Sequence, residues 1–314
     1  MYRIHPASKR RIATTYTLLA LALSIPVHAK ILHEERSVYT RIIVEDERNL
    51  RCLKFTLVRE NSRQTCMDRN NPQRLVFDYA KMTLAALLLI PDPERILIIG
   101  LGGGTLPMAL RDILPSAVID TVEIDEAVVR VAKRFFNFAE DDQNRVYVQD
   151  ARVFGKRAAL RGEQYDLIIL DAFDGEYIPE HLMTVEFLGE MRGLVNDDGV
   201  LVANTFASSK LYDYESATYA EAFGDFLNFR LPTSGNRVIL VPQAKLDIDL
   251  RTPLDRKTLR ANAEVLKVPM APYDMPLERY VSTLLSLSEQ KPDWNSRIRP
   301  LTDQFSPANV LQSQ

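Results

Sequence analysis

An apolar strand that runs directly into a glycine-rich loop is the feature that most constrains the fold of this chain. Residues 96–99 are all Ile or Leu, and residues 100–104 read Gly-Leu-Gly-Gly-Gly. Glycines permit a sharp turn and let the backbone approach a ligand without an intervening Cβ atom. About twenty residues later, Glu123 ends a second apolar run, where a carboxylate can accept hydrogen bonds from both hydroxyls of a ribose. This pairing predicts a nucleotide-cofactor site, and hence an enzyme.

Strand and helix patterns alternate between residues 95 and 242, as a parallel sheet covered by helices on both faces requires. We predict strands at 95–99, 118–123, 146–149, 167–170, 199–204 and 237–241. Apolar residues recur at helical spacing in residues 105–114 and 126–136, and these stripes are assigned to packing. The fold class is therefore α/β, with a Rossmann-like, mainly parallel and twisted sheet.

The rest of the chain is expected to divide into further units. Residues 30–71 carry short alternating patterns that predict a small antiparallel β unit in front of the main domain. A helical pattern from residue 72 to residue 90 opens the cofactor-binding catalytic domain, which extends to residue 242. Residues 243–314 are expected to form a helical extension that closes in a loop at 301–307.

The first 29 residues have the layout of a secretory signal. Four basic side chains precede an uncharged run from Ile12 to Val27, and small residues follow where cleavage is expected. The run is too short and too polar for a comfortable membrane span, so none is expected in the mature chain. The prediction is an exported or periplasmic protein. The alternative is a cytoplasmic protein with a mis-assigned start or an amphipathic terminal extension.

Cysteine usage leaves the compartment open. Cys52 and Cys66 are the two cysteines of the chain, and they flank a predicted hairpin with strands at 51–58 and 63–67. In an oxidising compartment they could bridge if their Cα atoms lie within about 7 Å. In a reducing one they are two small apolar side chains.

Metal and nucleic-acid binding are not expected. Four scattered histidines, without a close Cys or His pair, supply no metal ligand set. The formal net charge of −3 gives no broad basic surface for nucleic acid, which leaves a small molecule as the expected substrate.

Acidic residues end the predicted strands at the edge where open parallel sheets bind their ligands. Four acids follow the second, third and fourth strands: Glu123, Asp150, Asp171 and Asp174. One such carboxylate could simply cap a helix, but four around one glycine loop predict a functional site. Thr105 replaces the third glycine of the G-x-G-x-x-G spacing, which argues against a nicotinamide or flavin cofactor. A carboxylate at Asp150, followed by Ala151, is typical of sites for adenosyl sulfonium compounds.

The order and spacing of four motifs resemble those of the spermidine and spermine synthases, the polyamine aminopropyltransferases. The closest resemblance is to the spermidine synthase-like branch. The motifs are residues 100–105, 122–125, 149–154 and 165–174. The resemblance implies a class I methyltransferase fold, decarboxylated S-adenosylmethionine as the donor and a polyamine such as putrescine as the acceptor. It also implies a homodimer.

The same resemblance implies roles for individual residues. Asp171 matches the base that deprotonates the attacking amine, which is needed because an ammonium with a pKa near 10 cannot attack carbon. Asp174 matches the carboxylate that orients the amine, and Tyr79 falls near a position that lines the amine site. Glu176 is assigned to the same site for a different reason, as a substitute, like Glu180, for a family carboxylate that the glycine loop of this chain lacks. The donor site is assigned to Gln64, Gly100, Gly102, Gly103, Gly104, Glu123, Asp150 and Ala151.

Departures from the family pattern leave two alternatives. Leu101 and its neighbouring glycines supply no carboxylate for a cationic aminopropyl group, which favours an S-adenosylmethionine-dependent methyltransferase. A non-catalytic protein that binds a polyamine or nucleoside is the other alternative. His181 is assigned to loop packing, and Arg152 is expected to pair with a neighbouring carboxylate.

Overall fold

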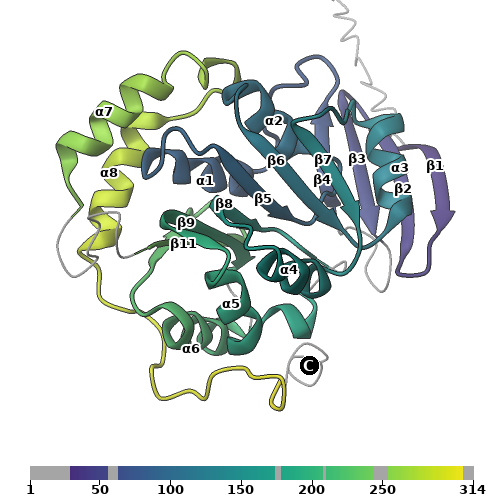
Figure 1. Ribbon diagram of the computed structural model, residues 1–314. Helices are drawn as coiled ribbons and strands as arrows, with labels where there is room; N and C mark the ends of the chain where they lie inside the picture. The colour runs from purple at the N-terminus through teal and green to yellow at the C-terminus, as the bar shows by residue number, and fades with distance from the viewer. Residues whose placement is uncertain (1–28, 56–62, 174–177, 208–209, 244–253, 307–314) are drawn as a thin grey trace, which may run out of the picture.

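The computed structural model describes residues 29–55, 63–173, 178–207, 210–243 and 254–306. The signal-like residues 1–28 therefore lie outside the described residues, as do Asp174 and Glu176. The described residues form a four-stranded antiparallel sheet and a seven-stranded, mainly parallel sheet (Figure 1). This architecture confirms the predicted α/β fold with a small β unit ahead of it. The division of the chain at residues 71 and 242 stays a prediction.

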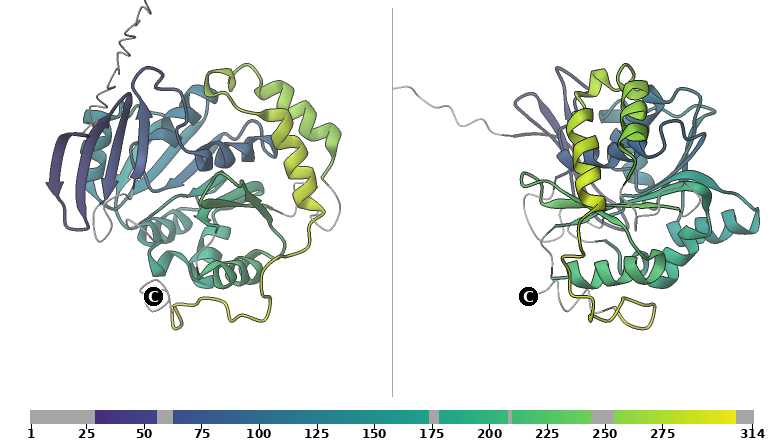
Figure 2. Two further views of the ribbon diagram at one scale, coloured as in Figure 1. Left: turned by 180° about the vertical axis from the view of Figure 1, so that it is seen from behind. Right: turned by 90° about the vertical axis from the view of Figure 1, so that its left-hand side faces the viewer.

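The small sheet lies at one end of the molecule and holds the disulfide (Figure 2). Its strands are β1 (Lys30–Arg36), β2 (Arg41–Glu47), β3 (Leu50–Phe55) and β4 (Arg63–Asp68), paired in that order. Val44 and Leu53 lie opposite each other and pack on helix α3 (Glu126–Phe135). Cys52 and Cys66 are also directly opposite, with Cα atoms 4.1 Å apart, and they form a disulfide. Of the two alternatives for these cysteines, the structure contains the bridge.

The order in which the chain adds strands to the large sheet reverses at its centre, between β5 and β8. Its strands are β5 (Arg95–Ile99), β6 (Val118–Glu123), β7 (Asn144–Val148), β8 (Tyr165–Leu170), β9 (Val195–Phe206), β10 (Leu227–Arg230) and β11 (Asn236–Pro242). They are ordered β10-β11-β9-β8-β5-β6-β7, and β11 runs antiparallel to both of its neighbours. The chain winds outward from β5 to β7 and then returns to β8. Ligands of such sheets bind beyond the carboxyl ends of the strands at this switch point.

Helices cover both faces of the large sheet (Figures 1 and 2). One face carries α1 (Asp78–Leu84), the 3₁₀ helix η1 (Ala85–Leu88), α2 (Thr105–Ile113), α7 (Arg256–Leu266) and α8 (Leu277–Ser288). The other carries α4 (Ala151–Leu160), α5 (Val185–Arg192) and α6 (Tyr212–Phe223). Strand β5 shows why its sequence is apolar throughout. Ile96 and Ile98 join the first cluster, while Leu97 and Ile99 join the second, because successive side chains point to opposite faces.

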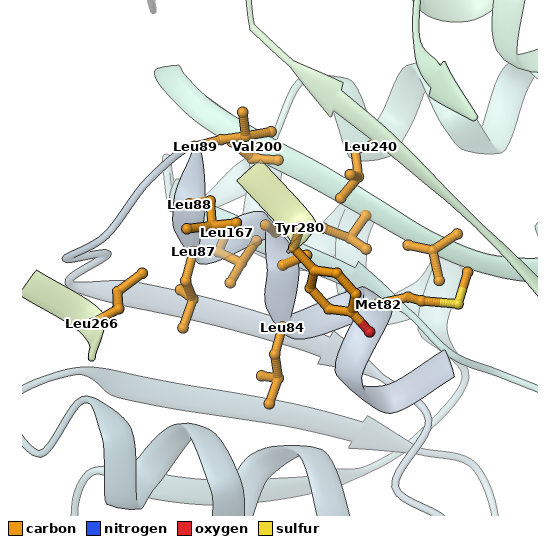
Figure 3. Close-up of a cluster of buried hydrophobic side chains, with 14 of the residues drawn as sticks. Met82, Leu84, Leu87, Leu88, Leu89, Leu167, Val200, Leu240, Leu266 and Tyr280 are labelled. Carbon is orange, nitrogen blue, oxygen red and sulfur yellow. The ribbon is translucent and has the colours of Figure 1, made fainter. Parts of the chain in front are cut away.

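The leucine-rich segment ahead of β5 is buried against the sheet and the C-terminal helices (Figure 3). Met82, Leu84, Leu87 and Leu88 are inaccessible to solvent, and Tyr280 of α8 packs into the same cluster. The helix predicted over 72–90 is shorter in the structure, because Leu75 pairs with Met67 in a β-bridge and α1 begins only after it. None of the helices within the described ranges is both long and apolar enough to span a membrane.

Candidate active site

A cavity of about 260 Å³ lies at the carboxyl ends of the central strands. Its lining includes most of the residues predicted for the site: Gln64, Tyr79, Gly100, Gly102, Glu123, Asp150, Ala151 and Asp171. They come from β4, α1 and the segments that follow β5, β6, β7 and β8. The topological switch point therefore brings together residues that are up to about a hundred positions apart in the sequence.

The glycines of the loop differ in what surrounds them. Gly100 has φ +99°, and a Cβ atom there would lie 2.3 Å from the carbonyl oxygen of Asp171. Only glycine permits this close approach between the loop and the end of β8. Gly103 and Gly104, which we predicted to contact a donor, are not in the cavity lining, and that role stays a prediction. A Cβ atom on Gly103 would lie 2.7 Å from Cγ2 of Thr65, and one on Gly104 would lie 2.6 Å from the ring of Phe138, so both glycines permit close packing of the loop.

Strand β4 supports the glycine loop from the small sheet. The hydroxyl oxygen of Thr65 accepts a hydrogen bond from the backbone N–H of Gly103 at 2.9 Å. The preceding residue, Gln64, lines the cavity, and the following residue, Cys66, carries the disulfide. The disulfide-linked sheet thus positions one wall of the cavity.

Glu123 is held toward the cavity by the backbone. Its Oε2 atom accepts from the N–H of Leu101 at 3.1 Å, and its Oε1 atom accepts from the N–H of Asp125 at 2.9 Å. Burial raises the pKa of the Glu123 carboxyl, while these backbone hydrogen bonds favour its charged form. Each oxygen keeps a further lone pair, so the side chain can still accept from a pair of ligand hydroxyls.

Asp171 lies in a chain of side-chain hydrogen bonds. The amide of Asn204, at the end of β9, donates to Asp171 Oδ1 at 2.8 Å, and Asn236 donates to Asn204 Oδ1 at 3.0 Å. Tyr79 donates a further hydrogen bond to Asp171. Burial raises the pKa of Asp171 to about 7, against the lowering effect of the two hydrogen bonds. A carboxylate that titrates near neutrality is suited to accept a proton from a substrate.

The two asparagines were not identified from the sequence. Asn204 follows an apolar run on β9, and β9 pairs directly with β8, so a polar residue at the end of this run is the signal that was available. Asn236 reaches the site because β11 lies beside β9.

Asp150 and His181 line the cavity near the carboxyl end of β7, which β5 and β6 separate from β8 and Asp171. Asp150 caps α4 by accepting from the N–H of Val153 at 2.9 Å through Oδ1. Its Oδ2 atom is 3.1 Å from Nε2 of His181. His181, which we assigned to a helix surface or to loop packing, lines the cavity and contacts a predicted donor-binding residue. The expected pairing of Arg152 is confirmed, with Glu190 and Asp303 as its partners.

A metal ion has no evident ligand set in this part of the molecule. Across the described residues, no group of three or more His, Cys, Asp or Glu side chains is placed to hold one. The acids that line the cavity are separated along the edge of the sheet: Asp171 follows β8 and Asp150 follows β7, and β5 and β6 lie between these two strands.

A mainly parallel sheet with a glycine loop and strand-end carboxylates around one cavity defines a protein of the class I methyltransferase fold. Two solved structures share this fold. A probable spermidine synthase from Corynebacterium glutamicum aligns with a TM-score of 0.58 and 20% identity over 85% of this chain and 98% of that chain. Human Methyltransferase-like protein 13, in complex with SAH, aligns with a TM-score of 0.51 and 23% identity over 74% and 96%.

Sequence comparison identifies the family. The spermine/spermidine synthase domain model matches residues 77–233. A polyamine aminopropyltransferase from Vibrio vulnificus is 50% identical over 285 residues, which cover 90% of this chain and 91% of that protein. The chain therefore belongs to the spermine/spermidine synthase family.

Proposed function

We propose that this protein is an aminopropyltransferase that moves an aminopropyl group from decarboxylated S-adenosylmethionine to a polyamine such as putrescine. The observation that carries the proposal is Asp171, whose carboxyl group is hydrogen-bonded to Tyr79 and Asn204 and has a pKa of about 7. This is the base that amine alkylation needs, because the acceptor is an ammonium until it loses a proton. The identity to the Vibrio vulnificus relative supports the same reaction class.

The reaction is a displacement at carbon. The carboxylate of Asp171 accepts a proton from the acceptor ammonium, and the free nitrogen attacks the methylene carbon bound to the sulfonium. The new C–N bond forms as the C–S bond breaks, and both electrons of that bond stay with sulfur, which releases methylthioadenosine. Most of the acceleration is expected from alignment of the nitrogen with this carbon. The hydrogen bonds from Tyr79 and Asn204 hold the Asp171 carboxylate in place for this step.

The donor would lie along the cavity between its acidic ends. We assign Glu123 to the ribose hydroxyls and Asp150 with Ala151 to the adenine, while Gln64, Gly100 and Gly102 line the same cavity and complete the donor site. Gly103 and Gly104 remain assigned to the donor site from the sequence. We keep Tyr79 in the amine site, together with Asp174 as the residue that orients the amine and Glu176 as a further carboxylate. Asp174 and Glu176 lie outside the described residues. The role of Asp174 rests on the family motif, and that of Glu176 on the need to replace the carboxylate that the glycine loop lacks.

A second candidate is methyl transfer from intact S-adenosylmethionine. It is favoured by Leu101, an apolar residue of the glycine loop that lines the cavity where the family pattern has an aspartate. Without that negative charge, the carboxylate of intact S-adenosylmethionine meets less repulsion. The two donors therefore have to be compared directly.

We also propose that the protein is exported and forms a homodimer. The signal-like pattern of residues 1–29 supports export, and so does the Cys52–Cys66 disulfide, because disulfides persist in oxidising compartments. The homodimer rests on the family resemblance.

The test is the release of methylthioadenosine from decarboxylated S-adenosylmethionine in the presence of putrescine, cadaverine or spermidine. We expect amine-dependent release by the wild-type protein, and loss of about 10²–10⁴-fold in kcat for Asp171→Asn. Asp142→Asn, which changes an exposed acid between α3 and β7, is the matched control and should leave the rate unchanged. Amine-independent release, or equal rates for the two variants, would rule out Asp171 as the base.

A further inference from the structure

The last described segment of the chain is held in place near the candidate active site by buried contacts and hydrogen bonds. After α8 the chain passes beneath α5 and α6 (Figure 1), and residues 301–305, which we call the C-terminal clasp, end this path. Leu301 is fully buried with Met183 and Leu211. Its carbonyl accepts from the N–H of Val185 at 2.9 Å, and its own N–H donates to the hydroxyl oxygen of Thr218 at 2.9 Å. The clasp therefore has a fixed place against α5 and α6.

Asp303 is the charged centre of the clasp. Its two carboxylate oxygens accept from the guanidinium of Arg152 at 2.8 and 2.7 Å. The hydroxyl of Thr184 donates to Asp303 Oδ1 at 2.8 Å, and the backbone N–H of Asp303 donates to Glu186 at 3.0 Å. A two-point guanidinium–carboxylate contact fixes orientation as well as distance. Asp303 thus joins the start of α4 to the start of α5.

Both side chains that donate to the Asp303 carboxylate are next to the donor cavity. Arg152 follows Asp150 and Ala151, which line one wall of the cavity. We call residues 178–182 the cover segment, and its residues Pro179, His181 and Leu182 line another wall of the cavity. Thr184 lies two residues after this segment. The two walls meet at the 3.1 Å contact between His181 and Asp150. Asp303, which is more than a hundred residues away in the sequence, therefore connects these two walls through its carboxylate. They belong to the part of the cavity that we assign to the adenosyl group.

The cover segment needs such an anchor because it has little structure of its own. Its one regular element is the 3₁₀ helix η2 (Glu180–Leu182), which is a single turn and too short to be stable alone. If the contacts of Asp303 are lost, the cover segment becomes ordered only when the donor binds. The entropy cost of this ordering then weakens donor binding. Tyr79 and Asp171 would keep their places in the amine site, because they are held by α1, β8 and β9.

We propose that Asp303 is a positioning residue for the donor: it holds the cover segment against α4 so that His181 and Leu182 enclose the adenosyl group. The proposal rests on the proposed function, in that it takes the bound molecule to be an adenosyl compound. It predicts a selective effect on donor binding, whereas a purely structural fastening would lower stability alone.

The test compares Asp303→Ala with Glu190→Gln in the full-length protein. Both changes remove a carboxylate partner of Arg152, but Glu190 lies on α5 and does not contact the clasp or Thr184 in any hydrogen bond or ion pair of the described residues. We expect Asp303→Ala to raise the KM for the donor and the Kd for methylthioadenosine about tenfold, equivalent to about 1.4 kcal/mol. All constants of Glu190→Gln should change less than about twofold, and Asp303→Ala should change the KM for the amine less than the KM for the donor.

A second pair of variants keeps the test decisive if Asp303→Ala does not fold. Thr184→Val removes the hydroxyl that contacts Asp303 and also caps α5, whereas Thr184→Ser keeps that hydroxyl. The proposal requires a raised Kd for methylthioadenosine in Thr184→Val and a wild-type value in Thr184→Ser.

The outcomes separate this proposal from the proposed function. An unchanged Kd for methylthioadenosine in Asp303→Ala, with a lowered Tm, would overturn the positioning role even if the enzyme is an aminopropyltransferase. A raised Kd in a protein that transfers no aminopropyl group would support the positioning role and overturn the proposed function. A wild-type protein that binds neither methylthioadenosine nor S-adenosylhomocysteine would overturn both.

Discussion

The Asp171 carboxyl group connects the fold of this protein to its proposed chemistry. It follows β8 at the switch point, where Gly100 allows the neighbouring loop to touch its backbone. Burial raises its pKa to about 7, while Tyr79 and Asn204 donate hydrogen bonds that favour the carboxylate. The balance of these opposing effects sets the fraction of enzyme that can accept a proton at a given pH.

The rate should therefore fall as the pH is lowered through about 7, because protonated Asp171 cannot act as a base. Replacing Asn204 by leucine removes a donor to the charged form, so it should raise the pKa of Asp171 and move this acidic limb to higher pH. The measurement is the pH dependence of kcat/KM for the amine in wild type and Asn204→Leu. Ionisation of the amine itself cancels in the ratio of the two profiles. Superimposable profiles would show that Asn204 does not tune the base.

Individual site residues could be predicted where their position along the chain defines their place in the fold. Glu123, Asp150 and Asp171 follow parallel strands, whose carboxyl ends meet at one edge of the sheet. Asn204 and His181 could not be found in this way. Their contacts depend on the pairing of β8 with β9 and on the path of the cover segment, which no local pattern specifies.

At the scale of elements, the small sheet and the glycine loop act as one unit. Strand β4 contributes Gln64 to the cavity, Thr65 to the loop and Cys66 to the disulfide in three successive residues. Side chains alternate along a strand, so Thr65 faces the glycine loop while Cys66 faces the opposite side of the sheet. Covalent closure of the hairpin therefore fixes the strand that supports the donor site.

Removing the disulfide should destabilise this unit. The bridge closes a segment with a sequence separation of 14 residues. A loop of this size predicts a loss of about 3 kcal/mol in the double variant Cys52→Ala, Cys66→Ala, or about 5–10 °C in Tm. Thermal unfolding with and without dithiothreitol measures it: the reductant should lower the Tm of wild type and leave that of the double variant unchanged. An equal response of both proteins would contradict a stabilising bridge.

Strands β5, β8, β9 and β11 were predictable because burial on both faces of the sheet gives each of them a continuous apolar run. Strand β10 was missed because it is only four residues long and includes Asn228 and Arg230. The helix predicted from residue 72 began too early, since the apolar residue Leu75 serves a β-bridge to Met67 instead of a helical stripe. In both cases tertiary pairing, which local spacing does not encode, decided the structure.

At the scale of the whole molecule, the proposed export raises the question of where the protein obtains its adenosyl donor. An enzyme that works outside the cytoplasm can use an adenosyl donor only where that donor is present or already bound. We expect the exported protein to begin at Lys30, after the small residues of the signal-like segment. Mass spectrometry of the protein recovered from the exported fraction tests this. An intact N-terminus on protein found only in the cytoplasm would contradict export.

The central claim is the transfer of an aminopropyl group, and one competition experiment tests it most directly. The wild-type protein is incubated with putrescine and an equimolar mixture of S-adenosylmethionine and its decarboxylated form, and the amine is analysed by mass spectrometry. We predict that the amine gains an aminopropyl group and that methylthioadenosine appears in equal amount. Methylated amine accompanied by S-adenosylhomocysteine, or an amine that is unchanged, would contradict the claim.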